Sequence, residues 1–158
     1  MKKITILGGG NMGLTYAASI YNSDLEAVIQ ILENAPERIQ EINALNTVMA
    51  GNDLEVLKDT DVLFLAVKPQ VTPEVFQNIK PYLNQKQLVV SIMAGVSIDT
   101  IQKGLGLNKV VRAMPNLPAQ VKLGMTTYVG SSEVGQEELA LIASILGATG
   151  KIAEVPRE

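Results

Sequence analysis

One short stretch near the start of the chain, ITILGGGNMG at residues 4–13, joins an apolar run to a segment that matches the pattern G-x-G-x-x-G. The apolar run predicts a buried β-strand, and a helix is expected to begin within the pattern. Gly8 permits the tight turn, Gly10 lets the backbone approach a pyrophosphate, and Gly13 lets the helix pack closely on the strand. The start of that helix would offer N–H groups and a positive dipole end to phosphates. The stretch therefore predicts a dinucleotide-binding loop, although a glycine-rich turn that binds nothing shares the pattern.

Beyond this stretch the chain alternates short apolar runs with longer amphipathic segments. The expected strands are residues 4–7, 27–32, 62–67, 88–93, 110–113, 125–129 and 152–155. The expected helices are residues 11–21, 53–58, 97–103 and 133–146, with two more that start near Pro36 and Thr72. This alternation predicts an α/β fold of the Rossmann type, a doubly wound, mostly parallel sheet with helices on both faces. No Gly-Lys-Ser/Thr follows the glycine loop, which excludes a P-loop.

The composition restricts the chemistry. Thirteen Lys and Arg against sixteen Asp and Glu give a net charge of −3, so neither nucleic acid nor an anionic membrane is indicated as a partner. The chain has no Cys and no His, which excludes disulfides, thiolate nucleophiles and Ser-His pairs. We expect no metal site. No stretch is apolar enough to span a bilayer, and the run after Met1 is too short for a signal peptide, so we expect a cytoplasmic protein.

An acidic residue stands at the end of the second expected strand. Glu33 follows Gly13 by 20 residues, the distance at which a carboxylate meets the adenosine ribose and repels a 2′-phosphate. This position favours NADH over NADPH. Two alternatives stay open, because Glu33 also fits a solvated strand end and Arg38, further along, could meet a 2′-phosphate.

Three later loops follow expected strands, and ligands of open α/β sheets lie beyond the carboxyl ends of strands. Lys68, before Pro69, could reach the cofactor or substrate, or be a solvated tip. The small residues at 94–96 leave room for a flat ring or make a turn. The two-proline loop at residues 112–118 could wall a pocket or be purely structural.

Taken together, these segments resemble pyrroline-5-carboxylate reductase. The matching pieces, in the family's order, are ILGGGNM (6–12), DVLFLAVKPQ (61–70), VSIMAGVSI (90–98), VRAMPN (111–116) and GMT (124–126). The resemblance covers essentially the whole chain, and the AVKPQ and MPN pieces are more specific to the family than the glycine loop. It implies reduction of the cyclic imine 1-pyrroline-5-carboxylate to L-proline with NADH or NADPH, a step in proline biosynthesis.

The resemblance also implies which residues bind the cofactor. Residues 7–12 would hold the pyrophosphate, and Val67, Lys68 and Ala94 would line the cofactor further along. An Asn that touches the cofactor in the family aligns near Asp53, with Asn52 adjacent. The complete set of expected cofactor-binding residues is Leu7, Gly8, Gly9, Gly10, Asn11, Met12, Glu33, Asn34, Asp53, Val67, Lys68, Pro69, Ala94 and Gly95.

The sequence departs from the family in several places. Asn34 stands where many members that prefer NADP carry Arg, which agrees with Glu33. Leu117 stands where Thr usually follows Met-Pro-Asn. Lys122 and Leu123 stand where the family has smaller and more polar residues.

Family members continue into a helical domain that forms the dimer and contacts the substrate carboxylate. We therefore expect residues 1–155 to form the dinucleotide-binding domain and residues 156–158 to begin that helical domain. The full-length protein is expected to be a homo-oligomer acting on a small imine, and this chain alone to be inactive. No residue is assigned as catalytic. The alternatives are another Rossmann dehydrogenase of the β-hydroxyacid type and a non-catalytic dinucleotide-binding fragment.

Overall fold

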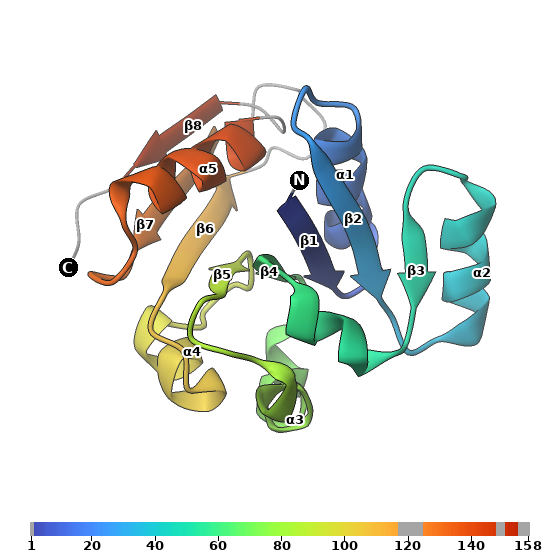
Figure 1. Ribbon diagram of the computed structural model, residues 1–158, viewed down its shortest axis with the longest axis horizontal. Coiled ribbons are helices and arrows are strands. Elements are labelled where there is room, and N and C mark those ends of the chain that lie inside the picture. Colours follow the sequence, from blue (N-terminus) through green and yellow to red (C-terminus); the bar gives the residue numbers. More distant parts are fainter. Residues whose placement is uncertain (1, 117–124, 148–150, 155–158) are drawn as a thin grey trace.

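The computed structural model describes residues 2–116, 125–147 and 151–154, which form one eight-stranded sheet. The strand order is β3-β2-β1-β4-β5-β6-β7-β8 (Figure 1). The strands are β1 (Lys2–Leu7), β2 (Ala27–Leu32), β3 (Met49–Gly51), β4 (Val62–Leu65), β5 (Leu88–Ser91), β6 (Val110–Asn116), β7 (Met125–Gly130) and β8 (Lys151–Glu154). All neighbouring pairs are parallel except β6 with β7. The expected Rossmann-type, mostly parallel sheet is therefore confirmed.

Helices cover both faces of the sheet. They are α1 (Asn11–Tyr21), α2 (Pro36–Ala44), α3 (Thr72–Ile79), α4 (Ile98–Leu105) and α5 (Gln136–Gly147), with 3₁₀ segments η1 (Leu54–Asp59), η2 (Pro69–Val71) and η3 (Lys80–Tyr82). One apolar cluster joins the sheet to α1, α2 and α5, and a second joins it to η1, α3 and α4. Because both faces are covered, β4 and β5 are buried along their whole length.

Several expected boundaries differ from the structure. The segment expected to be a helix at residues 53–58 is a 3₁₀ turn that begins after Asp53. The strand expected to reach residue 67 ends at Leu65, because Pro69 starts η2 shortly afterwards. The helix expected to start near Thr72 does so, since Thr72 is the first residue of α3, and its hydroxyl donates to the Pro69 carbonyl oxygen at 2.9 Å. The helix expected at residues 97–103 is α4, which Ser97 caps, since its Oγ accepts from Thr100 N at 3.2 Å.

The expected loop at residues 112–118 also needs correction. Residues 112–116 continue β6 and pair antiparallel with β7, up to Asn116 opposite Met125. On its other side β6 pairs with β5 only as far as Arg112. Pro115 therefore lies where one side of β6 has no ladder among the described strands, so its missing N–H is tolerated there. Leu117, Pro118, residues 122–124 and residues 155–158 lie outside the described part of the chain.

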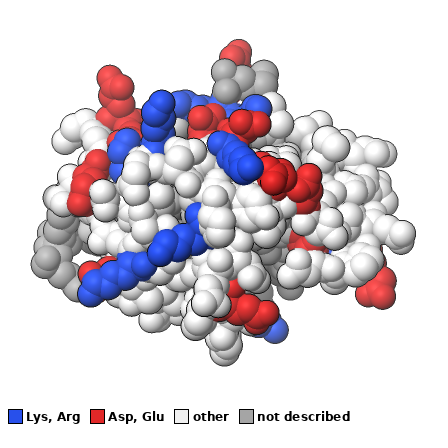
Figure 2. Space-filling view, turned by 60° about the horizontal axis from the view of Figure 1, so that its bottom comes forward, with Lys and Arg blue, Asp and Glu red and all other residues white. Residues whose placement is uncertain are grey.

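Charged side chains of both signs are interspersed over the face shown in Figure 2. Among the described residues, two of the four ion pairs join exposed neighbours on one helical segment, as in Lys103 with Asp99 at 3.0 Å. Such pairs contribute little to stability. Within residues 2–116, 125–147 and 151–154, no helix has the length and apolar character needed to cross a membrane.

Candidate dinucleotide site

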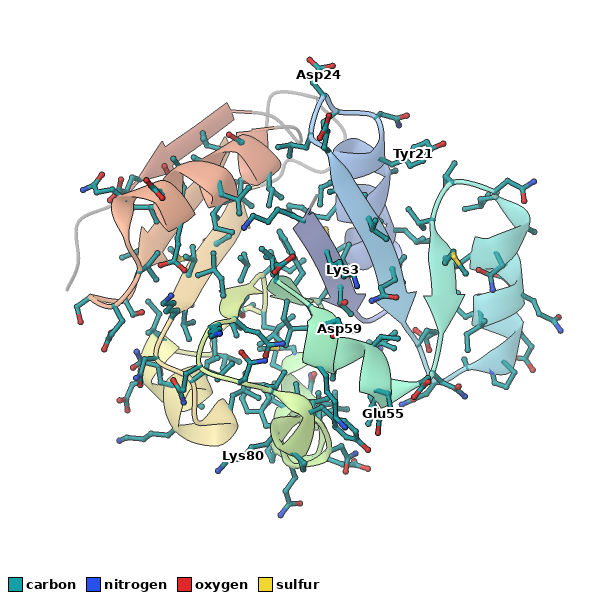
Figure 3. All side chains as sticks on the ribbon, in the orientation of Figure 1. Lys3, Tyr21, Asp24, Glu55, Asp59 and Lys80 are labelled. Carbon is teal, nitrogen blue, oxygen red and sulfur yellow. The ribbon has the colours of Figure 1, made fainter. Side chains whose placement is uncertain are left out.

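The candidate site lies at the carboxyl ends of the strands, where the strand order reverses. The chain runs outward from β1 to β2 and β3, then returns to the other side of β1 with β4. The loops that follow β1 and β4 therefore diverge at this point, and ligands of open α/β sheets bind in the resulting crevice. Tyr21 and Asp24, labelled in Figure 3, lie at the opposite end of the sheet, by the amino end of β2.

Two glycines of the loop are required by the fold itself. Gly8 has a φ of +112°, and a Cβ there would lie 2.7 Å from the carbonyl oxygen of Ala66, just past β4. A Cβ on Gly13 would overlap the Gly8 carbonyl oxygen. The turn and the close packing of α1 on the loop therefore depend on these two residues, as the pattern predicted.

Gly10 differs from both. An added Cβ would meet no described atom within 4 Å, so packing does not require a glycine at this position. Gly10 is the N-cap of α1 and makes no side-chain capping bond, and the first turn of α1 contains no acidic residue. The positive end of α1, which begins with Asn11 and Met12, thus faces open space beyond Gly10. The combination of space, N–H groups and dipole suits a phosphate group.

Glu33 and Arg38 hold the loop at Gly9. The Gly9 N–H donates to Glu33 Oε1 at 2.9 Å, and Arg38 Nε donates to the Gly9 carbonyl oxygen at 2.6 Å. The second carboxylate oxygen of Glu33 accepts from the backbone N–H groups of Asn34 and Ala35, both at 2.9 Å. Glu33, half-buried, therefore ties the loop after β1 to the loop after β2.

A cavity of about 310 Å³ opens beside these loops. Its size lies at the lower end of the range for small-ligand pockets. It is lined by Leu7, Gly8, Leu32, Glu33, Asn34, Asn52, Leu54, Val67, Val71, Glu74, Val75, Asn78 and Ile79. The lining joins residues after β1, β2 and β4 to one face of α3. It combines seven aliphatic side chains with five polar ones, two of which are the carboxylates of Glu33 and Glu74. This character suits a flat heterocycle next to a ribose.

Asp53 and Asn52 have different positions relative to this cavity. Asn52 lines it, whereas Asp53 lies outside the lining and caps η1, its Oδ1 accepting from Glu55 N at 3.0 Å. The lining residues from α3, which are Glu74, Val75, Asn78 and Ile79, are not among the candidates from sequence. Their signal is a spacing that places them with Val71 on one helix face directly after β4.

The remaining candidates lie on neighbouring loops. Lys68 is exposed and precedes η2, in which Pro69 is the first residue. Ala94 and Gly95 are exposed in the turn after β5, and Gly95 has a φ of +74°. Arg112 lies opposite Ser91, and its Nε is buried without a hydrogen-bond partner among the described residues. No described contact joins Lys68 to Arg112.

Comparisons with known proteins agree with this geometry. The chain is 35% identical to the pyrroline-5-carboxylate reductase of Escherichia coli K12 over 161 residues, which cover 99% of this chain and 60% of that protein. The structure of a pyrroline-5-carboxylate reductase from Coxiella burnetii aligns with a TM-score of 0.89 and 30% identity, over 98% of this chain and 59% of that one.

A pyrroline carboxylate reductase from Plasmodium falciparum, solved with NADP bound, aligns with a TM-score of 0.81 and 27% identity, over 98% of this chain and 58% of that one. The chain thus spans about three-fifths of the length of these relatives. The resemblance drawn from the sequence is confirmed over nearly all of the chain.

A family model described as NADP oxidoreductase, coenzyme F420-dependent, matches residues 3–95. The matched segment includes the glycine loop, Glu33 and the whole lining of the cavity. It also includes β1 from Lys3 onward and β2 to β5, the strands whose carboxyl ends form the candidate site. The chain belongs to this family of NADP oxidoreductases.

Proposed function

We propose that this chain is the dinucleotide-binding part of a pyrroline-5-carboxylate reductase and binds NADH or NADPH. The observation that carries the proposal is the open space at Gly10 in front of an uncapped helix. The fold does not need a glycine there, whereas a pyrophosphate does. The 35% identity to the Escherichia coli reductase supports the substrate class.

The residues of this chain bind and orient the cofactor. The loop at residues 7–12 holds the pyrophosphate through the N–H groups that follow Gly9, because those of Gly8 and Gly9 donate to the Leu32 carbonyl oxygen and to Glu33. The cavity beside Asn52 receives the adenine. Val67, Lys68, Pro69, Ala94 and Gly95 follow β4 and β5, towards which the rest of the dinucleotide would extend. When bound, the cofactor supplies a hydride to the imine carbon, and the protein contributes orientation and electrostatics.

NADH is expected to bind more tightly than NADPH. Glu33 occupies the N–H groups of Asn34 and Ala35, which a 2′-phosphate would otherwise use, and its charge opposes that phosphate. We expect NADPH to bind at least about tenfold more weakly, a difference of about 1.4 kcal/mol. Calorimetric titration with both cofactors measures it. Tighter binding of NADPH would show that Arg38 rather than Glu33 governs the ribose end.

The reductase activity needs a separate test, because the chain spans three-fifths of its relatives. We would join it to the remaining two-fifths of the Escherichia coli protein and measure NADH oxidation with 1-pyrroline-5-carboxylate. The chimera is expected to oxidise NADH with this substrate, whereas residues 1–158 alone should oxidise it at close to the uncatalysed rate. An open half-site leaves the substrate mobile and exposed to water. A chimera that oxidises NADH only with a β-keto acid would instead support a β-hydroxyacid dehydrogenase. Full activity of the unjoined chain would place the whole active site in it.

Two further expectations stay predictions. One is a homo-oligomer formed through a helical domain, and the other is a cytoplasmic location. Sedimentation of the chimera, compared with that of this chain alone, tests the first. A chimera that sediments as a monomer would contradict it.

A further inference from the structure

Gly9 is the one glycine of the loop that the pattern G-x-G-x-x-G does not specify. Its role is set by its neighbours, since a Cβ there would lie 2.9 Å from Glu33 Oε1 and 3.0 Å from Ile42 Cδ1. Both neighbours belong to the segment from β2 to α2. A side chain at this position would therefore displace the Glu33 carboxylate and the end of the Ile42 side chain, whether or not a ligand is bound.

Both polar groups of Gly9 are held from that same segment. Glu33 accepts its N–H, and Arg38 donates to its carbonyl oxygen. Arg38 is itself oriented by Glu41, whose Oε2 lies 3.0 Å from Arg38 Nη1. We call Glu33, Gly9 and Arg38 the glycine bracket. It fixes the peptide plane of Gly9 one residue before Gly10, where the phosphate is expected.

Most of the hydrogen-bonding capacity of Glu33 is used inside the bracket. A carboxylate offers about four acceptor positions, and Glu33 fills three with the N–H groups of Gly9, Asn34 and Ala35. About one position is left for a ribose hydroxyl. The larger part of the interaction of Glu33 is thus with the protein, and hydrogen bonds to a charged acceptor are the stronger kind.

We propose that Glu33 is a positioning residue that presets the glycine loop through Gly9, so that it supports pyrophosphate binding independently of any contact with the ribose. Arg38 completes the same device from the carbonyl side. This inference rests on the proposed dinucleotide binding and assigns to Glu33 a role beyond the choice between NADH and NADPH. It predicts that loss of the carboxylate also weakens the binding of ligands that lack the ribose 2′-hydroxyl.

The test combines one substitution with two ligands. Glu33→Gln keeps the size of the side chain but replaces one acceptor oxygen by a donor, so at least one set of backbone N–H groups loses its partner. The ligands are NADH and its 2′-deoxyadenosine analogue. Glu37→Gln is the matched control, because Glu37 is an exposed acid in the first turn of α2 with no side-chain contact described in the structure.

Glu33→Gln is expected to raise the Kd of both ligands by the same factor, about tenfold or more, as for the loss of a hydrogen bond to a charged group. Glu37→Gln should change neither. Weakening confined to NADH would overturn the proposal and leave Glu33 as a ribose ligand alone.

A second readout needs no ligand. In ¹⁵N NMR spectra of the free protein, the Gly9 amide proton should lose its protection from exchange in Glu33→Gln and keep it in Glu37→Gln. Unchanged Gly9 protection in Glu33→Gln would overturn the bracket. If wild-type protein binds neither dinucleotide, the proposed function fails, while this readout still decides whether Glu33 holds Gly9. Should Glu33→Gln not fold, Arg38→Met, which removes the donor to the Gly9 carbonyl oxygen, is expected to raise the Kd of both ligands by the same factor, and an unchanged Kd for both would overturn the bracket.

Discussion

Gly10→Val is expected to remove dinucleotide binding while the protein keeps its stability. The backbone of Gly10, with φ −74° and ψ −174°, suits any residue, and an added Cβ meets no described atom within 4 Å. The valine methyl groups would fill the space in front of α1 that the pyrophosphate needs. We expect the Kd for NADH to rise more than about a hundredfold, equivalent to about 2.7 kcal/mol.

Gly135→Val is the matched control for this substitution. Gly135 stands before α5 as Gly10 stands before α1, and in both places the carbonyl accepts the N–H of a leucine four residues later. A Cβ at Gly135 makes only an ordinary contact, 3.5 Å from Glu138 Oε1. Calorimetry and thermal unfolding of both variants separate binding from folding. Normal binding by Gly10→Val would mean that the loop is only a structural turn.

Gly13→Ala is expected to have the opposite profile and to destabilise the fold. The new Cβ would overlap the Gly8 carbonyl oxygen, a backbone atom that cannot rotate away. Either α1 moves off the sheet or the glycine loop shifts. We expect the free energy of unfolding to fall by about 3 kcal/mol or more, which is at the upper end for overpacked variants. In a domain of this size, such a change lowers the midpoint of thermal unfolding by roughly 6–12 °C.

The comparison of Gly13→Ala with Gly10→Ala makes that prediction specific. Alanine at Gly10 has room and should leave the midpoint within about 2 °C of wild type, as for a surface substitution. Differential scanning calorimetry of the two variants measures both values. Equal midpoints would indicate that α1 can move away from the glycine loop with little loss of stability, and the close packing assigned to Gly13 would then be wrong.

Much of the fold was predictable because both faces of the sheet are covered. Buried parallel strands such as Val62–Leu65 become continuous apolar runs, and the small residues of α1 mark a helix packed closely on the sheet. β3 was missed because its three residues carry no pattern, and it exists only as the parallel partner of β2. The antiparallel direction of β7 was also beyond reach, since an apolar run does not encode direction.

The site was predictable in part. The glycines and Glu33 stand at fixed offsets from a strand end, so their positions follow from the local pattern. What Glu33 binds does not follow, because its partners at Gly9 and Ala35 come from two loops whose approach depends on the whole sheet. The distinction between Asn52 and Asp53 is similar, since either can be a cap and only the start of η1 determines which one is.

The central place of β1 has a consequence for synthesis on the ribosome. β1 emerges first, yet one of its two neighbours is β4, and the Lys3 N–H donates to Asp61 across 58 positions of sequence. The glycine loop that follows β1 packs against the backbone of Ala66, just past β4. Long-range pairing of this kind is slow and waits for the later segment. The glycine loop is therefore translated early but reaches its final conformation only after β4 has been made. In nascent chains that stop before β4, the β1 amides on the edge that pairs with β4 should exchange their protons freely.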